Sequence, residues 1–403
     1  MPLPRTACRK TKMEIYMLIH TVRASEKLSE IAKNYGVDED ILRRNNDITE
    51  GEPAVGEELL ILTPTRTYTV KRGDSAERLA LRFGVRRRDM AAMNPQIECE
   101  GLVPGQKLAL RYDDRSYGMA AANGYYYNGC KAEQLKKRLP YLTYVTVSAA
   151  VAEGDELKLT FDGRDAVGIA RSADKIPLLR VYDKEKSRKP DASGKYGIIN
   201  KMISYAMGGG YKGITLGGQG ASDSFLVELR KSLLGCDLIL LTEVEADSPA
   251  YACEYADGSI LTYGKYGTPD LSFAEGEGET YSKFASECEG SKTFIELPSL
   301  ALCESGYIPV DEALARARRG GCEIGTDKAT LLSSFEHKRR GGHIFPSLSN
   351  IKATLDAVHE YGYMGISFDI MRTPLPYLMM YNALFGTSTY TSVRAPEGCS
   401  RGG

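Results

Sequence analysis

The 403-residue sequence lacks the features that mark several large functional classes. Its net charge is only −1 at pH 7, so electrostatics give no reason to expect a nucleic acid or an anionic membrane as partner. No stretch approaches the roughly 20 apolar residues that a membrane-spanning helix needs. We therefore predict no nucleic-acid partner and no membrane partner.

Few residues suit a metal site or a phosphate-binding loop. The four histidines, at positions 20, 337, 343 and 359, form no ligand-spaced pair with one another or with a cysteine. No Gly-Lys-Ser/Thr follows the glycine-rich stretches, as a phosphate-binding loop would require. We predict no metal and no cofactor.

Cysteine usage and the amino-terminal residues favour a reducing compartment. The nine cysteines include no C-x-x-C, and an odd number cannot all pair within one chain. Residues 1–12 are basic but lead into no apolar run of signal-peptide length. These features predict synthesis in the cytoplasm without a signal peptide.

Two copies of a small unit occupy residues 17–112. A shift of 48 aligns Thr21-Val22 with Thr69-Val70 and Asn46 with Asn94. The same shift aligns Val55 with Val103, Leu60 with Leu108 and Leu62 with Leu110. Each copy is predicted as strand, helix, helix, strand, and in the second copy the helices cover residues 75–83 and 88–93.

The second copy resembles the LysM module. The segments that carry this resemblance are Tyr68-Thr-Val-Lys-Arg-Gly-Asp-Ser75, Phe83-Gly-Val85, Met93-Asn-Pro95 and Leu102-Val-Pro-Gly-Gln-Lys-Leu108. We predict module 1 at residues 17–63 and module 2 at residues 66–112. The resemblance implies binding of N-acetylglucosamine glycans, such as peptidoglycan or chitin, between the turn after the first strand and the loop before the second. The glycan-binding residues that this resemblance implies are Gly73, Asp74, Ser75, Asn94 and Pro95.

A structural role competes with glycan binding at these positions, because Asp74 and Asn94 can simply cap and turn the fold. Module 1 departs from the pattern, since Arg23-Ala-Ser-Glu-Lys27 stands where module 2 has Lys71-Arg-Gly-Asp-Ser75. Its Gly-Asp turn is missing from the sequence. We expect its fold to be intact and leave its glycan binding open.

From residue 115 to 386 strands and helices alternate, which predicts a (β/α)8 barrel. The eight expected strands lie at residues 117–122, 142–149, 177–182, 211–216, 238–242, 259–263, 293–297 and 363–368. Helices are expected at residues 132–138, 166–172, 197–207, 222–234, 279–288, 348–360 and 377–384. The tail at residues 387–403 is rich in Gly, Ser and Pro and is predicted to be disordered.

The fourth strand resembles the Y-D-G-x-x-x-D-x-E signature of glycoside hydrolase family 18. Tyr211 and Gly213 match, but Lys212, Gly217 and Gln219 stand where the family has its first Asp, inner Asp and catalytic Glu. A glutamine amide has no proton to donate near neutral pH, and general-acid catalysis contributes about 10²–10⁴-fold. The resemblance therefore implies a barrel with no catalytic residue at these positions.

The barrel as a whole resembles the family 18 domain of LysM-bearing N-acetylglucosaminidases that act on spore cortex. Supporting segments are Pro140-Tyr-Leu-Thr-Tyr-Val145, Lys292-Thr-Phe-Ile-Glu-Leu-Pro298 and Glu360-Tyr-Gly-Tyr-Met-Gly-Ile-Ser367, with a small α+β insertion opening at Val310-Asp-Glu-Ala-Leu314. Tyr263 is retained where an adjacent Asp is lost, and Asp369 replaces the family's tryptophan in a chain that has none. Gln219, Tyr263 and Asp369 are thus the implied glycan-binding residues of the barrel.

Three functions remain open at this point. The first is peptidoglycan binding with an inactive barrel in a bacterial spore envelope. The second is an active N-acetylglucosaminidase of cortex peptidoglycan that uses relocated carboxylates, with Glu243, Glu245 and Asp369 as candidates. The third is a spore-coat scaffold that binds another envelope protein. A barrel mouth filled by side chains would favour the scaffold, and an open groove would favour sugar binding.

Overall fold

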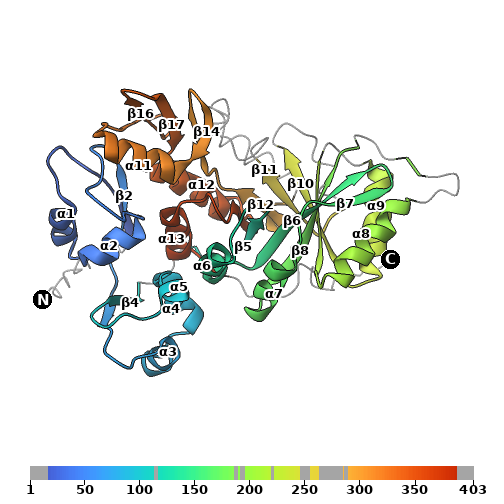
Figure 1. Ribbon diagram of the computed structural model, residues 1–403, viewed down its shortest axis with the longest axis horizontal. Coiled ribbons are helices and arrows are strands. Elements are labelled where there is room, and N and C mark those ends of the chain that lie inside the picture. The colour runs from blue at the N-terminus through green and yellow to red at the C-terminus, as the bar shows by residue number, and fades with distance from the viewer. Residues whose placement is uncertain are drawn as a thin grey trace, which may run out of the picture.

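The computed structural model describes residues 17–112, 117–185, 189–190, 196–218, 222–245, 255–262, 285 and 289–387. Figure 1 shows the two LysM-like modules at one end of the molecule and most of the barrel strands at the other. The predicted helix at residues 279–288 lies outside the described residues, apart from position 285. The tail from residue 388 onward and the positions Gln219 and Tyr263 also lie outside them.

Each module has the predicted order of elements. Module 1 consists of β1 (Met17–Thr21), α1 (Leu28–Tyr35), α2 (Glu39–Asn45) and β2 (Glu58–Leu62). Module 2 consists of β3 (Arg66–Thr69), α3 (Ala76–Phe83), α4 (Arg87–Met93), the short α5 (Ile97–Glu100) and β4 (Lys107–Arg111). Local signals explain the helix ends, because the Ser75 hydroxyl caps α3 and Gly84 ends it in a left-handed conformation. Helix α5 was not predicted.

The larger domain is a closed barrel of eight parallel strands. They are β5 (Met119–Tyr126), β6 (Tyr144–Glu153), β8 (Ile176–Asp183), β9 (Gly213–Gly218), β10 (Ile239–Glu245), β11 (Gly258–Thr262), β12 (Thr293–Glu296) and β18 (Gly365–Asp369). Closure follows from the pairing of β5 with both β6 and β18. All eight predicted strands are confirmed, with ends that differ by a few residues.

Helices surround this barrel, as the alternating pattern predicts. They are α6 (Ala132–Arg138), α7 (Arg164–Ser172), α8 (Gly197–Gly208), α9 (Asp223–Leu234), α12 (Leu348–Glu360) and α13 (Leu375–Leu384), with short turns η1 (Leu139–Tyr141) and η3 (Gly290–Lys292). Two further strands extend the sheet. Strand β7 (Glu156–Leu159) is antiparallel to β6, and β19 (Gly386–Thr387) pairs with β5.

An α+β insertion separates β12 from β18, as predicted. It contains β13 (Leu300–Cys303), β14 (Gly306–Pro309), α11 (Val310–Gly320), β15 (Gly325–Thr326), β16 (Leu332–His337) and β17 (Gly341–Pro346). Its five strands form an antiparallel sheet in the order β14-β13-β17-β16-β15. The insertion lies beside module 1 (Figure 1).

The structure corrects the repeat alignment in the second strand of each module. The Asn46 side chain accepts a hydrogen bond from the amide of Leu60, and the equivalent Asn94 accepts one from Ala109. The shift there is 49 residues, not 48, because module 2 has one extra residue in the loop before the strand. Leu60 is therefore equivalent to Ala109 and not to Leu108.

This one-residue difference decides which way the side chains of β2 point, because a slip of one residue reverses both faces of a strand. Leu59 and Ile61 pack in the core of module 1. Leu60 and Leu62 lie on the other face and belong to the main barrel core. Strand β2 is thus buried on both sides and joins module 1 to the larger domain.

Candidate functional site

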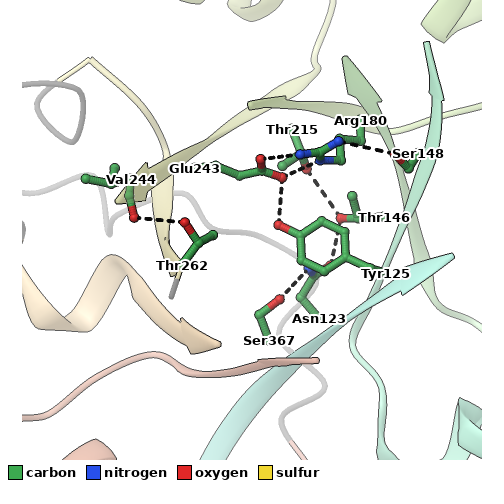
Figure 2. Close-up of polar contacts among 10 residues, drawn as sticks. All are labelled: Asn123, Tyr125, Thr146, Ser148, Arg180, Thr215, Glu243, Val244, Thr262 and Ser367. Carbon is green, nitrogen blue, oxygen red and sulfur yellow. Dashed lines mark hydrogen bonds and ion pairs between the residues drawn. The ribbon is translucent and has the colours of Figure 1, made fainter. Parts of the chain in front are cut away.

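The barrel interior is filled in layers. Apolar side chains from six strands form a buried cluster, which consists of Ala121, Tyr144, Leu178, Leu241, Ile260 and Phe294. A polar layer lies above it. There Asn123 donates a hydrogen bond to Ser367 (3.0 Å) and accepts one from Thr146 (2.7 Å), and all three residues are fully buried (Figure 2).

An ion pair occupies the layer nearest the mouth. Arg180 of β8 donates through Nε to Oε1 of Glu243 (2.5 Å) and through Nη2 to Oε2 (2.7 Å). The Tyr125 hydroxyl donates to the same Oε1 at 2.8 Å, and Arg180 also reaches the Ser148 hydroxyl at 3.3 Å (Figure 2). Both oxygens of the Glu243 carboxylate therefore accept from a guanidinium, the geometry of a strong bidentate pair.

Position 217 is a glycine because this ion pair fills the adjacent space. A Cβ on Gly217 would lie 2.0 Å from Oε2 of Glu243 and 3.0 Å from Nη2 of Arg180. Real side chains do not approach so closely. A carboxylate from β10 thus stands beside the position where the family resemblance expects an aspartate on β9.

The protonation states follow from this arrangement. Burial and the charge of Glu243 raise the pKa of Tyr125 well above its ordinary value, so the hydroxyl stays a neutral donor. Burial tends to lower the pKa of Arg180, but the carboxylate outweighs that effect and the pKa rises. Both oxygens of Glu243 already accept hydrogen bonds from Arg180, and Oε1 also accepts one from Tyr125, so the carboxylate is not placed to give a proton to a substrate oxygen.

The other two relocated carboxylates have different surroundings. Asp369 is the last residue of β18, and its Oδ1 accepts from the amides of Met371 (2.8 Å) and Arg372 (2.9 Å) and from the Tyr127 hydroxyl (3.3 Å). Burial nevertheless raises the pKa of Asp369. Glu245 is exposed at the end of β10. Lys212, the other degenerate position, is exposed just before β9 and far along the strand from Gly217.

In module 2 the structure brings the nominated turn against the loop before the second strand. Asp74 accepts from the Lys71 amide (2.7 Å) and the Tyr68 hydroxyl (2.9 Å), and the bond from Lys71 in particular lowers the pKa of Asp74. Burial and the bond to Asp74 raise the pKa of Tyr68. Two backbone bonds join turn and loop, from Val70 to Gln106 (2.9 Å) and from Gly105 to Val70 (2.8 Å). The Gly73 backbone is exposed at this junction.

The other two nominated residues, Asn94 and Pro95, follow helix α4 and are more deeply buried than the turn. Asn94 is 2% exposed, and its side chain bonds to Met90 and to both backbone groups of Ala109. Pro95 is also buried. Neighbouring Gln96, which the motif did not single out, is 8% exposed, and its amide has no hydrogen-bond partner among the described residues. Only the three-dimensional packing identifies it.

Module 1 retains the turn that its sequence appears to lack, which corrects that expectation. Ser25 adopts a φ of +65°, close to the +89° of Gly73. Glu26 accepts from the Arg23 amide (2.9 Å), and its carboxylate contacts Nε2 of His20 (2.9 Å). These contacts reproduce those of Asp74 with Lys71 and Tyr68, so other side chains build the same turn.

The loop before β2 in module 1 is packed against the insertion. The amide of Ile324 donates to the Val55 carbonyl at 2.8 Å, and a Cβ on Gly56 would lie 1.8 Å from the Ile324 oxygen. Arg318 forms a bidentate pair with Glu57 (2.6 and 3.1 Å). In module 1 the loop side of the expected glycan-binding groove is therefore covered by the insertion.

Within the described part of the chain, no group of three or more His, Cys, Asp or Glu residues is placed to hold a metal ion. None of the helices there is long and apolar enough to span a membrane.

Comparisons with known proteins agree with this architecture. Residues 20–61 and 68–111 each match the LysM domain, and no curated protein matches the chain. The spore cortex-lytic enzyme SleL of Bacillus megaterium QM B1551 is similar in structure, with a TM-score of 0.69 and 18% identity over 93% of this chain and 100% of that one. The SleL enzyme of Bacillus cereus has the same TM-score and identity, and covers 93% of this chain and 99% of that one.

A third similar structure is a chitinase from Chromobacterium violaceum ATCC 12472. It has a TM-score of 0.55 and 13% identity, over 66% of this chain and 98% of that one. The chain therefore contains two LysM domains followed by a barrel with the fold of family 18 chitinases and SleL enzymes.

Proposed function

We propose that this chain binds peptidoglycan, or another glycan containing N-acetylglucosamine, and that its barrel does not hydrolyse it. The observation that carries the second part is the Arg180–Glu243 ion pair beside Gly217. It supports inactivity because it occupies the space of a side chain that a family 18 mechanism needs, and because both oxygens of Glu243 are already engaged as acceptors.

Module 2 is the proposed main binding surface. The turns of both modules are largely exposed, but the loops before the second strands differ. Residues 103–105 of module 2 are exposed, whereas the corresponding loop of module 1 packs against Arg318 and Ile324. Gly73, Asp74 and Ser75 present backbone and small polar groups, which suit a neutral acetamido sugar. Asn94 and Pro95 contribute by fixing the loop. Gln96 is added as a candidate because its buried amide is unpaired.

The proposed setting is the envelope of a bacterial spore, reached after synthesis in the cytoplasm. This rests on the similarity to SleL, a spore cortex-lytic enzyme in two Bacillus species. Gln219, Tyr263 and Asp369 remain proposed sugar contacts of the barrel. Of these three residues Asp369 has the weakest support as a sugar contact, because its Oδ1 already accepts hydrogen bonds from two backbone amides of the following turn.

A second candidate is a scaffold whose barrel binds another spore-envelope protein and no sugar. The filled layer of Tyr125, Arg180 and Glu243 favours it, because side chains occupy the space in which a sugar ring would have to sit. In that case glycan binding resides in the LysM domains alone.

Purified cortical peptidoglycan fragments test both parts of the proposal. Binding is measured by co-sedimentation and cleavage by mass spectrometry, for the full chain and for Asp74→Ala. Glu26→Ala, at the same place in module 1, is the matched control. We expect binding without cleavage, weakened more by Asp74→Ala than by Glu26→Ala. Cleavage by the natural chain would refute inactivity, and absence of any glycan binding would refute the proposal that the chain binds peptidoglycan.

A further inference from the structure

A pocket of about 230 Å³ lies in the insertion, between the end of α11 and the β16–β17 hairpin. Figure 1 shows these elements on the edge of the molecule away from module 2. The pocket is lined by Arg316, Arg319, Gly320, His337, Arg339 and Arg340. We propose that it binds a phosphate group. This inference is independent of the glycan-binding proposal.

Every polar side chain that lines the pocket is a hydrogen-bond donor. Guanidinium groups have five N–H donors and no acceptor. Nδ1 of His337 accepts from the Arg339 amide at 3.2 Å, so the proton of the neutral ring lies on Nε2. That nitrogen lies beside Gly320, where a Cβ would be only 3.1 Å from it. The pocket thus offers donors to a ligand rich in acceptors.

Arg316 is held in place from the protein side. Its Nε donates to Glu312 at 2.9 Å, and its Nη1 lies 3.4 Å from Nε2 of His343. Nδ1 of His343 is 3.0 Å from the Gly341 carbonyl and so carries the proton, which leaves Nε2 as the acceptor. Burial and the charge of Arg316 lower the pKa of His343, so the ring supports the guanidinium without adding charge.

The charges of the pocket are unbalanced. Glu312 pairs with Arg316 and lies 3.9 Å from Arg319. Arg339 and Arg340 have no carboxylate within 4 Å in the described part of the chain. The carboxylates of Glu304 and Glu336 also lie near the hairpin, beside Gly341 and Gly342, but among the described residues neither forms an ion pair with the arginines that line the pocket. Of the four guanidiniums only those of Arg316 and Arg319 have a carboxylate within 4 Å, and they share that of Glu312.

A phosphate suits this pocket better than a single carboxylate does. Arginine forks match phosphate oxygens in bidentate geometry, and a phosphate offers more acceptor oxygens and more charge. The volume is below that of sites for drug-sized ligands but sufficient for a phosphate with its linking groups. Basic residues at the end of α11 also complement its dipole, but this does not explain Arg339 and Arg340 on the hairpin.

The test is calorimetric titration of the full chain with inorganic phosphate, with a glycerol phosphate polymer and with acetate. Arg339→Ala and Arg340→Ala are compared with Lys338→Ala, which removes the same charge from the same turn but does not line the pocket. We expect either arginine variant to weaken phosphate binding about tenfold or more, and Lys338→Ala about twofold or less.

The two phosphate ligands separate free phosphate from a phosphodiester polymer, and tight binding of either supports the pocket. Equal losses in all three variants would mean diffuse attraction and would overturn the proposal. So would acetate binding as tight as phosphate binding, or no binding of either phosphate ligand. All three positions lie in an exposed turn, and circular dichroism checks that each variant is folded.

Discussion

Glu243 and Gly217 share one space on neighbouring barrel strands. The carboxylate of Glu243 approaches within 2.0 Å of the point where a side chain at position 217 would begin. Because Arg180 binds both oxygens of that carboxylate, it cannot move aside without breaking a largely buried ion pair. A glycine at 217 and the ion pair therefore depend on each other.

The first prediction concerns restoration of the family 18 acids. Gly217→Asp with Gln219→Glu is expected to remain inactive and to lose about 1–3 kcal/mol of stability, because the new side chain overlaps Glu243. Adding Glu243→Ala should recover part of this loss, since Asp at 217 can then pair with Arg180. Urea denaturation compares the double variant, Glu243→Ala alone and the triple variant. Strictly additive effects would contradict the shared space.

The second prediction concerns the joint between module 1 and the insertion. Arg318→Ala leaves Glu57, which is 2% exposed, without its bidentate partner, so a loss of about 3–5 kcal/mol is expected. Arg319→Ala is the matched control, because that neighbouring side chain is 69% exposed and should matter little. Chemical denaturation and limited proteolysis between the modules provide the readout. Equal effects of the two variants would refute a specific joint.

The third prediction uses the equivalent left-handed turns. Ser25→Gly should stabilise module 1, because a non-glycine residue at a φ of +65° is strained. Gly73→Ser should destabilise module 2 at its φ of +89°, by about 1–2 kcal/mol. Thermal unfolding compares both variants with the natural chain. A shift of Tm in the same direction for both would show that the turns are not equivalent.

The fourth prediction concerns pH. Burial raises the folded-state pKa of Asp369 above its unfolded value, so the folded chain binds that proton more tightly. The stabilising contribution is therefore present at low pH and is lost as pH rises through the folded pKa. Asp369→Asn keeps an acceptor oxygen for the turn and removes the titration. Its Tm relative to the natural chain should rise between about pH 3.5 and 7.

Asp162 provides a control of opposite sign for this experiment. Hydrogen bonds from Arg164 lower the pKa of Asp162 to about 2, so its contribution is present above the unfolded pKa and is lost as pH falls. Asp162→Asn should therefore lose Tm relative to the natural chain as pH rises. If the Tm of both variants, relative to the natural chain, changed in the same direction with pH, the opposite pKa shifts assigned to Asp369 and Asp162 would be contradicted.

Much of the fold was predictable because its signals are local. Short apolar runs that alternate with helical segments mark the barrel strands, and glycines such as Gly84 mark helix ends. The repeat was visible in Asn46 and Asn94, whose side chains tie the second helix to the second strand in both modules. The alignment was wrong by one residue in that strand, since only hydrogen bonds reveal which residue Asn46 meets.

The candidate site was less predictable. The degenerate positions Lys212, Gly217 and Gln219 were evident from the sequence, but what stands beside Gly217 was not. The pairing of Arg180 with Glu243 joins residues 63 positions apart. It depends on where β8 and β10 place their side chains around β9, and that arrangement is set by barrel closure.

The sequence by itself determined the two modules, the eight strands and the absence of the expected acids, because these follow from residue types and short-range spacing. Only the tertiary structure decided that an ion pair fills the barrel mouth, that Ser25 and Glu26 rebuild a turn, and that β2 is buried on both faces. The ion pair and the burial of β2 depend on contacts between segments distant in sequence, which are set by packing rather than by local propensity. The turn is made by contacts within a few residues, but its side chains differ from those of the usual motif and only their geometry shows the equivalence.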